Sequence, residues 1–186
     1  MRLAPNSSVP VTVAGNGTTG ATPTQLSCVL GIFVDDEKTL YIADYSNHRI
    51  QKWFNGASSG ITVAGTGVCG SSFTQLCKPK WVILDVNGNM YIADNGNHRI
   101  MRYAPGASSG DCIIACTGTS GIGSNQLNGP VGLAFDSAGS IYVSDLGNYR
   151  VQKFSLVTNA SQTTTTILTT TIRSSSTSAR GLSTSS

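Results

Sequence analysis

The sequence predicts an all-β protein made of repeated four-stranded units, on the basis of composition and of an internal repeat. Only 11% of the 186 residues are charged, and glycine, serine and threonine are plentiful. This composition is typical of short strands joined by many turns. A segment of eleven residues also recurs three times, as Leu40–Ile50, Met90–Ile100 and Ile141–Val151, starting at positions 40, 90 and 141. The chain is therefore built from units of about 50 residues.

Each unit is expected to contain four strands. In the second unit we expect them at about 81–85, 90–94, 99–103 and 112–115, with turns at Asn87-Gly88, Asn95-Gly96 and Pro105-Gly106. By the same alignment, 11–15 and 61–65 are each expected to form the last strand of a unit. Four strands in each period predict the blades of a β-propeller, in which every sheet packs against its neighbours through both faces. The continuous apolar runs at 32–34 and 82–84 are typical of strands covered on both faces.

Further positions keep the same phase in the three copies. A Gln-Leu pair begins each unit, an aspartate ends its first strand, and an aromatic residue lies near the end of its third strand. These positions are Gln25-Leu26, Gln75-Leu76 and Gln126-Leu127, then Asp35, Asp85 and Asp136, then Trp53, Tyr103 and Phe154. Together with the Ala-Asp-x-x-Asn-His-Arg-Ile segment, this pattern resembles the NHL repeat over about residues 9–154. Val29, Trp81 and Tyr149 depart from it, where the other copies have proline, glycine and histidine.

The resemblance implies part of a six-bladed ring. NHL propellers mostly bind protein, peptide, glycan or RNA partners, so a non-catalytic interaction or scaffold module is the expected function. One alternative is the substrate-recognition part of a ubiquitin-ligase-like NHL protein, although the cysteines and histidines of a RING domain are lacking. A metal-dependent propeller lyase or hydrolase is a further alternative. Three blades do not close a ring, so we expect closure by missing sequence or by self-association.

The repeat divides the chain into three regions. Residues 1–15 are expected to be the end of a truncated preceding blade, because Met1–Pro5 aligns with Met101–Pro105. Residues 16–154 hold the three NHL blades, as units 25–76, 75–127 and 126–154, and the third can be completed by a strand from 162–172, which is rich in threonine and isoleucine. Residues 155–186 form a low-complexity tail rich in serine and threonine.

Cysteine usage and charge limit the compartment and the partners. Cys28, Cys69, Cys77, Cys112 and Cys116 allow two disulfides and one free thiol, with the pairing left open. With no CxxC pair, and with both histidines expected elsewhere, no metal or cofactor is predicted. Possible glycosylation sites and the Ser/Thr tail favour an extracellular location. The net charge of +3 is too small to indicate nucleic acid by itself, and no apolar run is long enough to insert into a membrane.

The repeated charged residues are expected to be structural, and no catalytic residue is predicted. Asp35, Asp85 and Asp136 recur at the same strand end, which favours a role in closing turns. An arginine follows the second aspartate of each unit by five residues, so a hairpin would allow a charge-assisted hydrogen bond within each pair. These pairs are Asp44 and Arg49, Asp94 and Arg99, and Asp145 and Arg150.

Two further surfaces could bind a partner. Lys52, Arg102 and Lys153 lie beside aromatic residues on the third strands, which would suit RNA, but a solvated blade edge explains the same pattern. Protein or peptide is the favoured partner. Propeller ligands usually contact loops at one end of the axis. The variable loop residues are therefore the predicted contacts, namely Tyr45, Ser46, Asn95, Gly96, Leu146 and Gly147.

Overall fold

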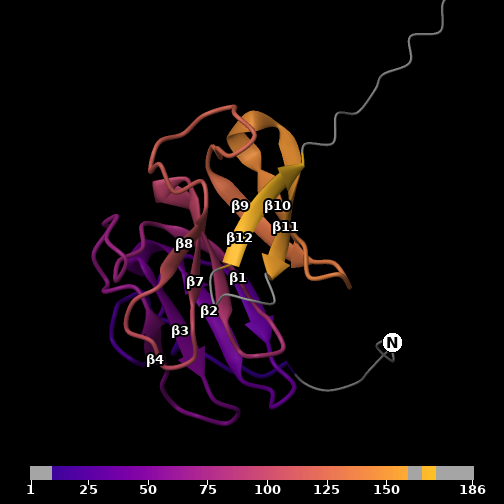
Figure 1. Ribbon diagram of the computed structural model, residues 1–186. Helices are drawn as coiled ribbons and strands as arrows, with labels where there is room; N and C mark the ends of the chain where they lie inside the picture. Colours follow the sequence, from indigo (N-terminus) through magenta and orange to yellow (C-terminus); the bar gives the residue numbers. More distant parts are fainter. Residues whose placement is uncertain (1–9, 159–164, 171–186) are drawn as a thin grey trace, which may run out of the picture.

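The computed structural model describes residues 10–158 and 165–170. It contains three four-stranded antiparallel sheets, each formed by strands that follow one another in the chain (Figure 1). The predicted all-β fold with propeller-type blades is confirmed. The part of the chain that the structure describes has no helix that is long and apolar enough to cross a membrane.

The blades are numbered in chain order. Blade 1 consists of β1 (Val29–Val34), β2 (Leu40–Asp44), β3 (Arg49–Trp53) and β4 (Ile61–Ala64). Blade 2 consists of β5 (Pro79–Leu84), β6 (Met90–Asp94), β7 (Arg99–Tyr103) and β8 (Asp111–Ile114). Blade 3 consists of β9 (Pro130–Phe135), β10 (Ile141–Asp145), β11 (Arg150–Thr158) and β12 (Thr165–Thr170). One short 3₁₀ turn joins the second and third strands of each blade: η1 (Tyr45–Asn47), η2 (Asn95–Asn97) and η3 (Leu146–Asn148).

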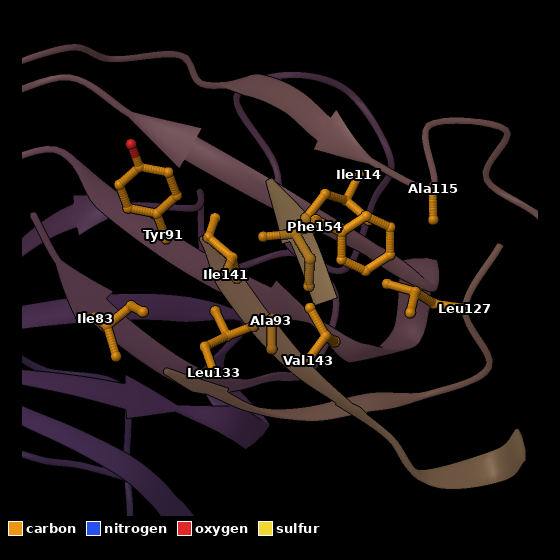
Figure 2. Packing of buried hydrophobic residues seen from close by; sticks show 11 residues of the cluster. Ile83, Tyr91, Ala93, Ile114, Ala115, Leu127, Leu133, Ile141, Val143 and Phe154 are labelled. Carbon is orange, nitrogen blue, oxygen red and sulfur yellow. The ribbon is translucent and has the colours of Figure 1, made fainter. Parts of the chain in front are cut away.

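The core lies between the blades. One apolar cluster joins blades 1 and 2 and includes Ile50, Val82 and Ile92. A second joins blades 2 and 3 and includes Ile100, Leu133 and Phe154 (Figure 2). Both surfaces of blade 2 are therefore covered, because each strand of a packed sheet sends alternate side chains to opposite faces.

The first strands of the three blades lie next to one another, since β5 contacts both β1 and β9. Gly31 allows β1 to approach β5 closely. A Cβ atom at Gly31 would lie 2.6 Å from the carbonyl oxygen of Lys80. A larger residue at this position would push the two strands apart.

The aspartate at the end of each first strand closes the following turn. The Oδ1 atom of Asp35 accepts a hydrogen bond from Thr39 N at 2.8 Å. Asp85 accepts from Asn89 N at 2.9 Å, and Asp136 from Ser140 N at 2.8 Å. These bonds explain why an aspartate occupies the same position in three turns.

Two details of the predicted strands are wrong. Residues 10–15 form no strand, although 11–15 were expected to be one. The comparable strands β4 and β8 pair only with the third strand of their own blade, and the corresponding partner, residues 1–5, lies outside the described residues. The predicted end of a preceding blade at 1–15 is thus described only from residue 10.

The second error concerns coverage of the apolar run at 32–34. Ile32 and Val34 are exposed, whereas Val82 and Ile83 of the second run are buried. The reason is position, because β5 has a blade on each side and β1 has one on one side only. In blade 2, the predicted strands 90–94 and 99–103 match β6 and β7 at both ends, and the predicted 81–85 and 112–115 differ from β5 and β8 by one or two residues at their ends.

Candidate functional site

The three 3₁₀ turns lie at the same end of their sheets and contain the predicted ligand contacts. Each turn is followed by a residue in the left-handed conformation, namely His48, His98 or Tyr149, with φ between 52° and 54°. Backbone N–H groups of these residues donate to the first residue of the turn. The turn conformation is therefore the same in all three blades, while its side chains differ.

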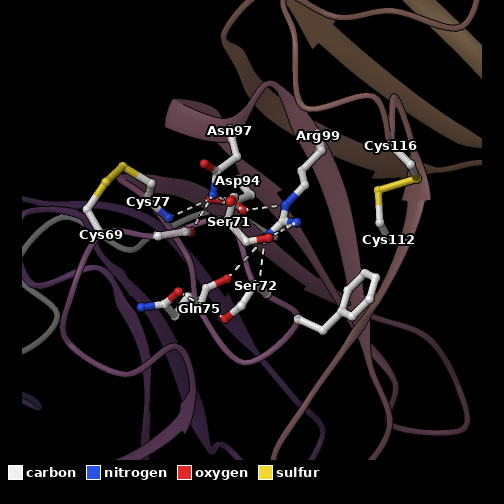
Figure 3. Close-up of polar contacts among 12 residues, drawn as sticks. Cys69, Ser71, Ser72, Gln75, Cys77, Asp94, Asn97, Arg99, Cys112 and Cys116 are labelled. Atoms are coloured by element: carbon white, nitrogen blue, oxygen red, sulfur yellow. Dashed lines mark hydrogen bonds and ion pairs between the residues drawn. A yellow bond between two sulfur atoms is a disulfide. The ribbon is translucent and has the colours of Figure 1, made fainter.

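A buried network of an aspartate, an asparagine and an arginine holds each turn in place. In blade 2, Arg99 Nε and Asn97 Nδ2 each donate to Asp94 Oδ2 at 2.8 Å, and Cys77 N donates to Asp94 Oδ1 at 2.7 Å (Figure 3). The Asp94 carboxylate is fully buried. Burial raises the pKa of Asp94, and the hydrogen bonds from Asn97, Cys77 and Arg99 act in the opposite direction.

The same network ties down the segment that leads into the blade. The guanidinium of Arg99 donates to the carbonyl oxygens of Ser71, Ser72 and Gln75, and Asn97 donates to that of Gly70. The equivalent bonds recur in the other blades, where Arg49 and Arg150 lie 2.8 Å from Asp44 and Asp145. The six residues expected to form a structural repeat network therefore lie together in three pairs, and their polar atoms are used within the blades.

Histidines connect one blade to the next. Nδ1 of His48 accepts a hydrogen bond from Lys78 N at 3.1 Å, and Nδ1 of His98 accepts one from Gly129 N at 3.0 Å. Both bonds cross a blade junction. Tyr149, which has the equivalent position in blade 3, is 97% exposed.

The predicted ligand contacts are divided between blade junctions and the surface. Asn95 Nδ2 donates to the carbonyl oxygen of Pro130 in the next blade at 3.0 Å, and the ring of Tyr45 lies 5.9 Å from Lys80 Nζ. The other four residues are exposed, and the structure does not gather all six at one place; these four are Ser46, Gly96, Leu146 and Gly147.

A group next to the turns was missed by sequence reasoning. At the junction of blades 1 and 2, Lys80 Nζ lies 5.9 Å from the ring of Tyr45, and Trp81 follows Lys80 on β5. We call Tyr45, Lys80 and Trp81 the aromatic patch. Trp81 lies on the exposed part of β5 and lines a cavity of about 650 Å³ together with Lys80 and Leu30. The sequence already marked this position, because Trp81 lies where the other two units have Gly31 and Gly132.

The repeated basic residues on the third strands already have partners within the chain. Lys52 Nζ lies 5.4 Å from the ring of Tyr41. Arg102 pairs with Asp111 at 3.0 Å, and Lys153 with Asp136 at 2.9 Å. These contacts favour a structural role for the basic residues over an RNA surface.

The cysteines form two disulfides, Cys69–Cys77 and Cys112–Cys116, and Cys28 is free and exposed. The expectation that both histidines lie away from the cysteines is wrong for His48. His48, Cys69 and Cys77 each place a possible metal-ligand atom within 4.8 Å of the others. The two sulfur atoms are bonded to each other within the segment leading into blade 2, and His48 Nδ1 accepts a hydrogen bond from Lys78 across the junction, so these atoms already have partners.

The comparison with family models matches the NHL repeat at residues 26–53 and 127–154. Two segments of the chain therefore match the NHL repeat. The matched segments run from the Leu of each Gln-Leu pair to the aromatic residue of the third strand, in blades 1 and 3. Blade 2 has the same strand order and the same buried network as these two blades. A comparison with curated protein sequences finds no significant match.

Solved structures with a similar fold include both binding proteins and enzymes. An auxiliary nutrient binding protein from Bacteroides ovatus aligns with a TM-score of 0.58 and 19% identity. The alignment covers 70% of the present chain and 37% of the nutrient binding protein. A gluconolactonase from Xanthomonas campestris aligns with a TM-score of 0.55 and 12% identity, over 79% and 48%. Virginiamycin B lyase from Staphylococcus aureus gives 0.53 and 15%, over 84% and 45%. The present chain thus spans less than half the length of each of these three proteins, and the similarities establish the fold alone.

Proposed function

We propose that this protein is a non-catalytic interaction module that binds a protein, peptide or glycan partner through the aromatic patch and the exposed turns beside it. The observation that carries the proposal is the placement of Trp81. This large side chain is 36% exposed at a position where the other two blades have glycine, so the strand of a blade can form without a side chain there.

The chemistry of the patch suits such partners. An exposed indole ring offers a large rigid surface for stacking on a sugar or for packing against an apolar side chain. Lys80 adds a positive charge, 5.9 Å from the ring of Tyr45, that can pair with a partner's carboxylate. Because η1 is fixed by the buried bonds of Asp44 and Arg49, the patch is preorganised and little ordering is needed on binding.

The polar groups near the turns support binding rather than catalysis. The Asp44, Asp94 and Asp145 carboxylates are fully buried and accept hydrogen bonds from arginine, asparagine and backbone groups. Among the buried tyrosines, desolvation raises the pKa of Tyr91 and of Tyr103 to about 12. The three carboxylates have no exposed surface with which to contact a substrate.

The test compares binding by the wild-type chain with binding by Trp81→Gly on peptide and glycan arrays, followed by titration of each hit. Trp81→Gly recreates the residue found at Gly31 and Gly132, so the blade should still fold. We expect binding to weaken at least about tenfold, the effect of losing a large aromatic contact. Val86→Ala is the control, because Val86 is fully exposed in the turn between β5 and β6, away from the patch. Equal binding by wild type and Trp81→Gly would contradict the proposal.

A second measurement separates binding from catalysis. Purified protein is analysed for stoichiometric divalent metal and assayed for lactone hydrolysis and for lyase activity. We expect neither metal nor turnover. Metal at one ion per chain together with turnover that survives in Trp81→Gly would favour an enzyme instead.

A further inference from the structure

The two end blades expose apolar residues that the interior junctions bury. Ile32 of β1 is 52% exposed, whereas Val82 and Leu133, at the same position of blades 2 and 3, are buried. Val151 of β11 is 64% exposed, whereas its equivalents Ile50 and Ile100 are buried. The difference arises from the neighbouring blade and not from the residue type, since all six side chains are aliphatic.

Each blade has two different faces. We call the face toward the preceding blade the leading face and the face toward the following blade the trailing face. At the first junction, Ile50 and Tyr41 on the trailing face of blade 1 pack with Val82 and Ile92 on the leading face of blade 2. At the second junction, Ile100 and Tyr91 of blade 2 pack in the same way with Leu133 of blade 3.

Each end blade leaves part of one face open, and the two faces are one of each kind. On the leading face of blade 1 the open part is limited to β1, since Ile42 and Gln51 of the same face are buried. Blade 1 exposes its leading face along β1, with Leu30, Ile32 and Val34. Blade 3 has its trailing face open, with Tyr142, Ser144 and Val151. The cavity of about 650 Å³ lies over this face and is lined by Gly132, Ala134, Tyr142, Ser144 and Val151 in addition to Leu30, Lys80 and Trp81. At the interior junctions, the corresponding surface of blades 1 and 2 is covered by the first strand of the next blade.

We infer that a second copy of this chain covers these faces, with blade 1 of each copy packed on blade 3 of the other. This junction would repeat the geometry of the two interior junctions, because the faces carry equivalent residues. A head-to-tail contact of this kind closes when the two ends meet. Two copies suffice by length, since one chain spans 37% to 48% of the propeller-type structures described above. The inference goes beyond the proposed function, and its surface adjoins the aromatic patch, because Lys80 and Trp81 line the same cavity.

The polar contacts of the interior junctions predict which residues meet. His48 lies against Lys78, and His98 against Gly129. In the junction between copies, the equivalent residues are Tyr149 of one copy and Cys28 of the other. Both are exposed in the single chain. A cysteine placed at 149 should therefore lie beside the free thiol of Cys28 in the partner copy.

The first experiment measures mass by size-exclusion chromatography with light scattering, using the full 186-residue chain of 19.3 kDa. We expect twice this mass for wild type. Ile32→Glu and Val151→Glu should each give the single-chain mass, because each places a charge in the junction. Ile61→Glu is the matched control, since Ile61 is similarly exposed but lies on the outer strand β4. Circular dichroism establishes that each variant is folded.

The second experiment uses Tyr149→Cys under mild oxidation without added reductant. We expect a covalent dimer, joined through Cys28, that is absent in Tyr149→Cys combined with Cys28→Ser. A wild-type chain that remains monomeric at about 100 µM would overturn the inference and leave the faces to another part of a longer protein. Species larger than two copies, or a dimer without the crosslink, would overturn the closed arrangement. Loss of ligand binding by Trp81→Gly with an intact dimer would separate the two surfaces.

Discussion

Lys38 has a left-handed backbone conformation, and the equivalent residues of the other two blades are glycines. It lies in the turn between β1 and β2 with φ of 62°, whereas Gly88 and Gly139 have the same place in blades 2 and 3, with φ of 78° and 80°. A residue with a Cβ atom is strained in this region by roughly 1 kcal/mol or more. The repeat itself therefore indicates a stabilising substitution.

We expect Lys38→Gly to increase the free energy of unfolding by up to about 1 kcal/mol, because relief of strain outweighs the added freedom of the unfolded chain. The measurement is urea denaturation followed by circular dichroism. Gly139→Lys serves as the reverse substitution, since nothing lies within 4 Å of a Cβ atom at this position. It should lower the stability by a similar amount. The same midpoint for wild type and Lys38→Gly would contradict the assigned strain.

Asp136 gives a prediction for acid conditions. A hydrogen bond from Lys153 lowers the pKa of Asp136 to about 2, and backbone N–H groups of Ser140 and Ala138 act in the same direction. Because the folded pKa lies below that of an unfolded aspartate, near 4, the carboxylate stabilises the fold above about pH 4. This contribution is lost as the pH falls toward 2.

Unfolding of wild type and Asp136→Asn should therefore differ at pH 6 and converge near pH 2. Thermal melts at several pH values test this. Asp36→Asn provides a comparison at an exposed aspartate near the equivalent turn of blade 1, and its stability should follow wild type closely. A difference between wild type and Asp136→Asn that is constant from pH 6 to pH 2 would contradict the pairing with Lys153.

At the residue scale, the sequence predicted roles better than partners. A spacing of five residues across a short turn was enough to pair Asp94 with Arg99. It was not enough to show that the same guanidinium reaches Ser71, Ser72 and Gln75, because those contacts depend on the path of a loop 24 to 28 residues earlier. The hydrogen bond from Lys78 to His48 crosses 30 residues for the same reason.

At the scale of the blade, the buried network should contribute much more to stability than an exposed ion pair does. We expect Arg99→Met to lower the free energy of unfolding by about 3–5 kcal/mol, because it leaves the buried Asp94 without its charged partner. Asp111→Asn breaks the exposed pair with Arg102 and should cost no more than about 1 kcal/mol. Both values come from denaturant unfolding. Equal losses in the two variants would show that the network is not the element that fixes the turn.

Strands and turns were predictable because they depend on local pattern, whereas the limits of the structural unit were not. The repeat begins, by sequence, with the Gln-Leu pair at 75–76. In the structure, the preceding residues from Gly70 onward are bonded to Arg99 and Asn97 of blade 2. The unit that folds together therefore starts shortly after β4, which no alignment of the three copies could reveal.

For the whole molecule, the sequence predicted an incomplete ring but not which surfaces it leaves uncovered. The runs at 32–34 and 82–84 have the same apolar character, and only the order of blades in space distinguishes the exposed Ile32 from the buried Val82. The aromatic patch was missed for a related reason. Tyr45 and Lys80 lie 35 residues apart in the sequence, and they come together only because blade 2 follows blade 1 around the axis.

The cysteines take on a different meaning once the unit is seen to start after β4. Cys69 and Cys77 lie in the segment leading into blade 2, and Cys112 and Cys116 lie at its last strand, so both disulfides belong to one blade. Neither bond joins two blades. The central blade alone is covalently reinforced, and a chemical reductant would act on the middle of the molecule while leaving its flanks unaltered.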